Sequence, residues 1–133
     1  MFIGHLPAGY LCTRFLIFQA RQKLPWVNQR ARLWMGLGLI ASVLPDADLI
    51  YFYLIDNRQH LHHTYLTHIP VYWLGLFAIL MIYCRLSRNQ RLCFGTIILG
   101  VNVMIHLFLD TVVGKIQWLY PFCNDDFVFF EVS

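Results

Sequence analysis

Four stretches of mostly apolar residues follow one another along the chain, separated by short polar segments. The clearest is residues 65–84, which contain 20 positions and no Lys, Arg, Asp or Glu. A helix needs about 20 apolar residues to cross the hydrocarbon core of a bilayer. Residues 92–109 and 33–44 predict two further spans, and residues 7–20 predict a helix that either spans or lies partly in the interface. The pattern therefore predicts about four helices.

The composition indicates that these helices belong to a membrane protein. Of the 133 residues, 59% are hydrophobic and only 13% are charged. Soluble domains carry about 25% charged residues, so the composition excludes both an ordinary soluble domain and a disordered tail. The length allows a single membrane-embedded domain over residues 1–133. The four cysteines have neither zinc-ribbon nor disulfide-scaffold spacing.

The charges are segregated in a way that predicts the topology. Seven of the ten basic residues fall within residues 21–32 and 85–91, and no acid lies in either segment. Because Lys and Arg favour cytoplasmic loops, both segments are predicted to be cytoplasmic. They are short and cap membrane helices, so membrane lipids are expected as partners and nucleic acid is not. We expect an all-α, multi-pass inner-membrane bundle of about four antiparallel helices, with a metal site at the end opposite the basic segments.

The strongest candidate for chemistry is the pair His106 and Asp110. Their i, i+4 spacing places both side chains on one face of a predicted helix. Imidazole and carboxylate together form half of a zinc or iron site. The alternative is a simple His–Asp hydrogen bond near a helix end. The position inside an apolar span favours a functional role, because ionisable groups are costly there.

Further carboxylates and imidazoles lie towards the same end of the predicted bundle. Asp46 and Asp48 follow the helix predicted over residues 33–44, and their apolar flanks hold them near the membrane surface. The alternative is a helix stop with solvated aspartates. Four histidines then occur within nine residues, of which we take two as surface residues; neutral imidazole is the commonest metal ligand. The histidines that this topology brings to this end are His5, His60, His62, His63 and His68.

The order of these residues resembles the YdjM-like family of inner-membrane-associated, metal-dependent hydrolases. The resemblance covers roughly residues 4–122 and is carried by Gly4-His5-Leu6, Leu44-Pro45-Asp46-Ala47-Asp48, His63 with Thr67-His68, and His106-x-x-x-Asp110. A more remote similarity is to zinc-dependent phospholipase C and the single-strand-specific zinc nucleases. The resemblance implies a metal site with Asp110 as a bridging carboxylate, and the ligands that it implies are His5, Asp46 or Asp48, His63 or His68, His106 and Asp110.

Two features depart from the resembled family. Thr64 stands where the His-x-x-x-Thr-His element usually carries arginine, which removes an expected contact to phosphate. Many relatives continue into a further helix, whereas this sequence stops at Ser133. We therefore expect either a site with fewer metals or a shortened chain.

The residues and the resemblance together predict a membrane-bound, metal-dependent hydrolase, with a phosphoester or lipid-linked phosphate as the favoured substrate. A divalent metal, with zinc favoured, would activate the attacking water. Asp46 or Asp48 would be the catalytic residue that orients or deprotonates this water. The main alternative is a non-catalytic metal-binding or transport protein. A di-iron enzyme needs more ligands than six histidines supply, and a haem bundle held by two histidines is the last alternative.

Overall fold

The computed structural model describes residues 2–49, 66–123 and 125–130 of the chain. Within these residues the protein is all-helical, with five α-helices, two 3₁₀ turns and no named strand. The elements in chain order are α1 (Phe2–Arg21), α2 (Pro25–Gln29), α3 (Ala31–Ala41), η1 (Pro45–Ala47), η3 (Leu66–His68), α5 (Pro70–Ser87) and α6 (Gln90–Val113).

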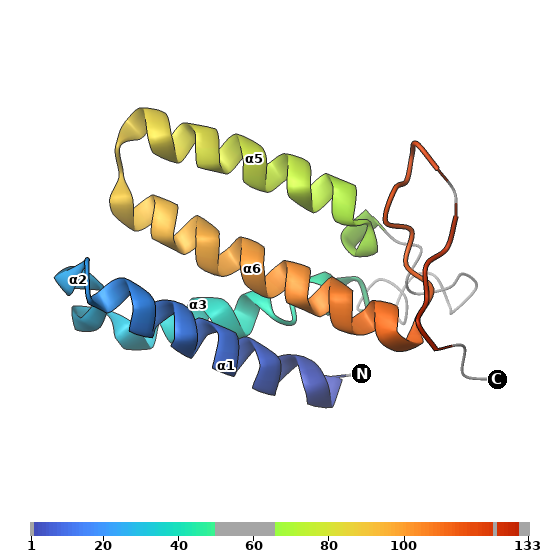
Figure 1. Ribbon diagram of the computed structural model, residues 1–133, viewed down its shortest axis with the longest axis horizontal. Helices are drawn as coiled ribbons and strands as arrows, with labels where there is room; N and C mark the ends of the chain where they lie inside the picture. Colours follow the sequence, from blue (N-terminus) through green and yellow to red (C-terminus); the bar gives the residue numbers. More distant parts are fainter. Residues whose placement is uncertain (1, 50–65, 124, 131–133) are drawn as a thin grey trace.

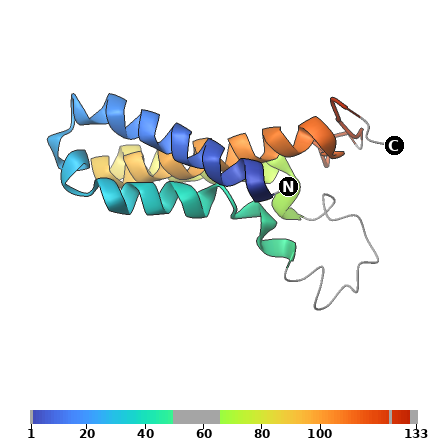
Figure 2. The ribbon, with the colours of Figure 1, turned by 90° about the horizontal axis from the view of Figure 1, so that it is seen from below.

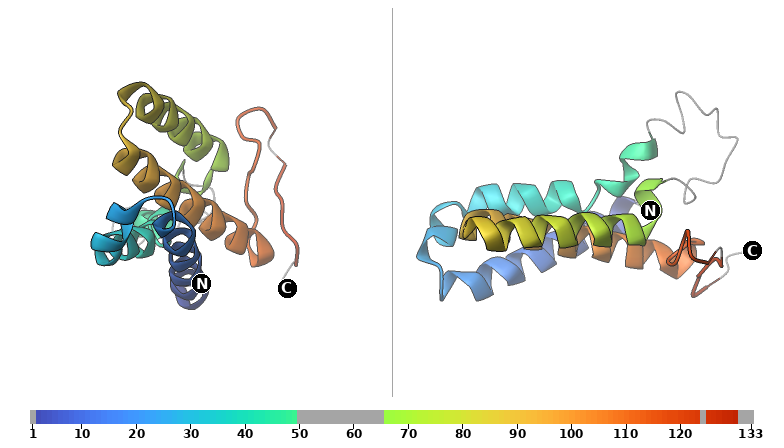
Figure 3. Two further views of the ribbon diagram at one scale, coloured as in Figure 1. Left: turned by 60° about the vertical axis from the view of Figure 1, so that its left-hand side comes forward. Right: turned by 90° about the horizontal axis from the view of Figure 1, so that it is seen from above.

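Helix α6 is the centre of the bundle. It packs against α5 on one side and against α1 and α3 on the other (Figure 1). The view from below shows α1, α3 and α6 running side by side along the long axis of the molecule (Figure 2). The two further views place α2 and the turn between α5 and α6 at one end, and the N-terminus at the other (Figure 3). The two basic segments therefore share one end, as the charge pattern predicts.

The hairpin of α5 and α6 has clear local causes in the sequence. Pro70 begins α5, where its missing N–H costs no helical hydrogen bond. Arg88 closes the turn in the left-handed region at φ 52°. The side chain of Asn89 then caps α6 by accepting hydrogen bonds from the backbone N–H groups of Arg91 and Leu92, both at 3.1 Å.

Two of the described helices, α5 and α6, are long and apolar enough to cross a membrane. Side chains of α5 such as Ile79 and Ile82 are more than 60% exposed, which suits a face turned towards lipid. Helix α3 has 11 residues and rises about 17 Å, roughly half of a hydrocarbon core of about 30 Å. Helix α1 has 20 residues but contains Arg14 and is not one of the two. The four-span topology therefore stays a prediction.

Close contacts in the middle of the bundle fix α1 against its neighbours. A Cβ atom at Gly38 of α3 would collide with the side chain of Thr13, and one at Gly9 would collide with Ser42. Asn102 of α6 donates a hydrogen bond from Nδ2 to Oγ1 of Thr13 at 3.0 Å, and both side chains are fully buried. Small residues thus allow α1, α3 and α6 to approach closely, and a buried hydrogen bond sets their alignment.

The segment after α6 folds back onto the end of that helix. Ile116 and Phe127 exchange two backbone hydrogen bonds of 3.0 Å. Phe129 donates its N–H to the carbonyl of Thr111 at 3.0 Å. The described residues of this segment, 114–123 and 125–130, contain no helix.

Candidate metal centre

Four buried side chains converge at the end of the bundle opposite the basic segments. They come from three separate elements: η1 after α3, η3 before α5, and the last turns of α6. All are at most 6% exposed. One nitrogen or oxygen atom from each lies within 4.8 Å of the corresponding atom of every other. The four residues are Asp46, His68, His106 and Asp110.

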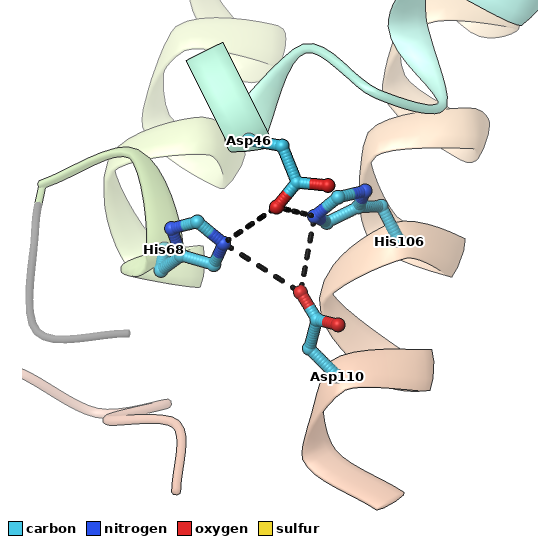
Figure 4. Close-up of side chains that lie close together, drawn as sticks. All are labelled: Asp46, His68, His106 and Asp110. Atoms are coloured by element: carbon cyan, nitrogen blue, oxygen red, sulfur yellow. Dashed lines mark ion pairs between the residues drawn. The ribbon is translucent and has the colours of Figure 1, made fainter. Parts of the chain in front are cut away.

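The donor atoms alternate between nitrogen and oxygen around a four-membered ring (Figure 4). Nε2 of His106 lies 3.0 Å from Oδ2 of Asp110 and 3.6 Å from Oδ1 of Asp46. Nε2 of His68 lies 3.5 Å and 3.6 Å from the same two oxygens. Tetrahedral zinc with bonds of about 2.0–2.2 Å separates its ligand atoms by about 3.3–3.6 Å. The ring therefore has dimensions that a metal ion of this size fits with little adjustment.

His106 is held in the orientation that a metal requires. Its Nδ1 lies 2.7 Å from the carbonyl oxygen of Ser42, at the end of α3. A carbonyl only accepts hydrogen bonds, so Nδ1 must carry the proton and donate it. In the neutral ring the lone pair is then on Nε2, which faces the two carboxylates. This outer hydrogen bond fixes both the tautomer and the ring plane.

His68 is oriented in the same way by a carboxylate. Its Nδ1 lies 2.9 Å from Oδ2 of Asp48, on the side of the ring away from the cluster. Thr67 donates its hydroxyl hydrogen bond to the same oxygen. Trp73 donates its indole N–H to the carbonyl of Thr67 at 2.8 Å, which ties η3 to the first turn of α5. A carboxylate behind a metal-binding histidine is a common arrangement in zinc sites.

The three aspartates around His68 shift its titration strongly. Burial alone lowers the pKa of His68, but the carboxylates of Asp110, Asp46 and Asp48 outweigh it and raise the pKa to about 10. Without a metal, the imidazole is therefore protonated at neutral pH and its positive charge stabilises the carboxylates. A metal ion must displace this proton to bind Nε2.

His5 contacts the centre from its outer side. Its Nε2 lies 3.1 Å from Oδ1 of Asp110, the oxygen that does not take part in the ring. Its imidazole stacks on that of His106, with ring centroids 4.0 Å apart, and it is only 2% exposed. Asp110 thus directs one oxygen to the ring and the other to His5. His5 therefore holds the outer oxygen of Asp110.

The structure can be compared directly with the ligands that the sequence predicts. It brings His5, Asp46, His68, His106 and Asp110 into contact, and it places Asp48 behind His68 rather than in the ring. The other predicted ligand, His63, lies outside the described residues, as do His60 and His62.

Three contributions to the centre have little or no signal in the sequence. The carbonyl of Ser42 acts through the backbone, so its residue type does not reveal it. The hydroxyl of Thr67 binds Asp48, and Ile69 rather than Thr67 is the residue that precedes α5. The tryptophan at position 73 would be taken for an interfacial residue, but its indole holds η3 in place. In these cases the tertiary fold decides the role.

The donor set is suited to a divalent metal of the first transition series. Imidazole and carboxylate are ligands that Zn²⁺, Fe²⁺ and Mn²⁺ all accept, so the residues do not select among them. Asp46 and Asp110 together supply two negative charges, which balance a divalent ion inside a buried site. The centre is therefore a possible metal site of two imidazoles and two carboxylates.

Comparison with known proteins identifies the family of the chain. No curated protein and no solved structure gives a significant match to the chain. Residues 1–130, nearly the whole chain, match the family described as YdjM inner membrane protein. The chain therefore belongs to the YdjM family of inner membrane proteins.

Proposed function

We propose that this protein is a metal-dependent hydrolase of the inner membrane that acts on phosphoesters. One observation carries the proposal: the two ring nitrogens at the centre, Nε2 of His68 and of His106, are both freed for a metal by hydrogen bonds at Nδ1. A His–Asp pair that served only stability would not need a second histidine with the same orientation. Zinc is favoured because the four N···O distances around the ring, 3.0–3.6 Å, are close to the spacing of its ligand atoms.

A divalent metal at this centre would lower the pKa of a water molecule to about 7 and polarise the phosphoryl group. The residues of the chain then divide the remaining tasks. Asp46 has one oxygen in the ring, so its carboxylate is the group within reach of the water's proton. Asp48 contacts the far side of His68 and orients it. We therefore assign proton transfer to Asp46 and a positioning role to Asp48.

The reaction balances without a further reactant. The oxygen of water forms a new bond to phosphorus, and the bond from phosphorus to the alcohol oxygen breaks. The proton of the water passes to Asp46 and from there to the departing alcohol. His5 holds the outer oxygen of Asp110 throughout, which keeps the inner oxygen directed at the ring.

The position of the centre supports a lipid-linked phosphate as substrate. Asp110 lies in the last turn of α6, a helix long enough to span, so the centre sits near one surface of the bilayer. Lipid phosphates lie at this depth, whereas their hydrocarbon chains remain in the core. A soluble phosphoester would have no comparable reason to meet a site at the end of a membrane helix.

One observation favours a second candidate, a metal-binding protein without turnover. All four side chains of the ring are at most 6% exposed, and structural metal sites are typically closed with four protein ligands. Catalytic sites keep one position open for water or substrate. A closed centre of this kind would store or carry the ion, or stabilise the bundle.

Metal analysis and a substrate screen on the same detergent-purified protein separate the two candidates. The screen pairs phosphomonoesters and phosphodiesters, each as a water-soluble and a lipid-linked compound. For a hydrolase, the zinc-loaded protein turns over at least one class, His106→Ala abolishes this activity, and Asp125→Asn on the exposed C-terminal segment leaves it unchanged. Stoichiometric metal with no turnover of any phosphoester would reject the hydrolase and support the second candidate.

A further inference from the structure

A second pocket lies at the basic end of the bundle, far from the metal centre. It is about 410 Å³ in volume and is formed between Leu24, the end of α5 and the start of α6. Its floor is apolar and includes the buried side chains of Cys84 and Phe94. Two guanidinium groups, those of Arg85 and Arg88, line the same pocket and are exposed. An apolar floor beside two cations is a chemical combination that the metal centre does not use.

The positive charge of this pocket is not neutralised within the described chain. No Asp or Glu occurs between Asp56 and Asp110 in the sequence, nor anywhere before Asp46. Neither Arg85 nor Arg88 forms an ion pair with another described residue. The pocket therefore presents two cations at the depth of the lipid headgroups and attracts an anion there.

An apolar groove along the membrane-spanning hairpin adjoins the pocket at Ile97. The groove is about 500 Å³ in volume, runs between α5 and α6, and shares Ile97 with the pocket. From Cys93 at the pocket to Met104 in the groove, α6 rises roughly 16 Å. This is about half of a hydrocarbon core of about 30 Å, the depth that one leaflet occupies. The groove therefore has the length of an acyl chain.

We infer that the pocket and groove bind an anionic phospholipid from the leaflet at the basic end. Its phosphate contacts Arg85 and Arg88, and one acyl chain lies along Ile97 between α5 and α6. Basic pockets between membrane helices bind anionic headgroups in this way. Volumes of this size hold a small molecule rather than a second helix. The site is separate from the metal centre, so it does not depend on hydrolysis.

Native mass spectrometry of the full-length protein in detergent tests the headgroup contact. The probes are phosphatidylglycerol, phosphatidylethanolamine with the same acyl chains, and glycerol phosphate. We expect Arg85→Gln with Arg88→Gln to weaken phosphatidylglycerol binding about 25-fold, since each arginine near the surface contributes about fivefold. The matched control is Arg30→Gln with Arg32→Gln, which removes the same charge from the other basic segment. Replacing Arg85 and Arg88 with lysine should restore most of the binding.

A second pair of variants tests the acyl chain. Ile97→Trp fills the junction of pocket and groove and should weaken phosphatidylglycerol binding, whereas Ile79→Trp on the exposed face of α5 should not. Helical content and metal content show that each variant is folded. The inference is overturned by equal losses in the two double arginine variants, or by glycerol phosphate binding as tightly as the lipid. It is also overturned if both lipids bind equally. A dimer that retains no lipid would overturn it too, because a second copy of the chain would then cover the groove.

Discussion

Replacing Asp110 with asparagine should remove most of the metal affinity of the protein. The substitution keeps the size and shape of the side chain and removes one negative charge. Asp110 contacts three imidazoles: Nε2 of His106 at 3.0 Å, of His68 at 3.5 Å and of His5 at 3.1 Å. No other side chain of the centre contacts as many histidines among the described residues. The change therefore affects every imidazole that the structure places there.

The expected loss follows from the roles of these contacts. Removal of an outer group that merely supports a ligand typically costs about 10–100-fold in metal affinity. Asp110 would itself be a ligand, and it carries one of the two negative charges that balance a divalent ion. We therefore expect a loss of at least about 100-fold, which corresponds to about 2.8 kcal/mol at 1.4 kcal/mol per factor of ten.

Zinc titration against a chromophoric chelator measures this affinity, and thermal unfolding with and without chelator gives an independent measure. Asp125→Asn serves as the matched control, because it removes the same charge from an exposed segment outside the centre. His60→Ala, at a histidine outside the described residues, should be nearly silent because we take it as a surface residue. The reasoning fails if Asp110→Asn retains the metal content and affinity of the parent, or if His60→Ala loses its metal while Asp110→Asn does not.

Three further predictions concern the second carboxylate, pH and topology. Asp48→Asn should weaken zinc binding about 10–100-fold without abolishing it, because Asp48 orients His68 and stands outside the ring; a loss as large as that of Asp110→Asn would contradict this role. In the metal-free protein, the raised pKa of His68 contributes stability that is complete below pH 6.5 and is lost as the pH rises towards about 10. The thermal unfolding temperature in chelator should therefore fall over this pH range, and His68→Gln should remove the pH dependence. In a cysteine-free background, cysteines introduced at Ser87 and Gln59 should be labelled from opposite sides of the membrane, whereas labelling from the same side would reject the four-span topology.

The hydrophobic pattern predicts the membrane hairpin well, and the differences lie at its ends. Residues 65–84 are predicted as one helix, but the observed α5 runs from Pro70 to Ser87. The reason is Pro70, because the residue before a proline is driven out of the helical region, and Ile69 is extended accordingly. Helix α6 begins two residues before the predicted start at 92, because Asn89 caps it there. Capping and proline effects thus move boundaries that hydrophobicity alone leaves undefined.

The sequence predicts less completely which residues form the metal centre, and the reason is geometric. The i, i+4 spacing of His106 and Asp110 suffices to place them together, because a helix has a fixed period. Asp46 and Asp48 cannot be distinguished in this way. Asp46 lies within the 3₁₀ turn η1 and Asp48 directly follows it. With three residues per turn, side chains two positions apart point in directions that differ by about 120°. One therefore enters the ring, and the other lies behind His68.

The residues of α1 that contact α6 are spaced as far apart as their partners on α6. An insertion or deletion in either helix would therefore disturb the centre. His5 and Thr13 are eight residues apart on α1, and their partners Asp110 and Asn102 are eight residues apart on α6. In both contacts the two residue numbers add up to 115. This is expected for antiparallel helices, because the numbering rises along one helix as it falls along the other. One inserted or deleted residue between His5 and Thr13 would turn the histidine by about 100° and shift it by about 1.5 Å. A substitution that avoids the closely packed Gly9 leaves this alignment unchanged, whereas an insertion or deletion shifts it. Among relatives that assemble the same centre, both eight-residue intervals should therefore be invariant even where the residues between them differ.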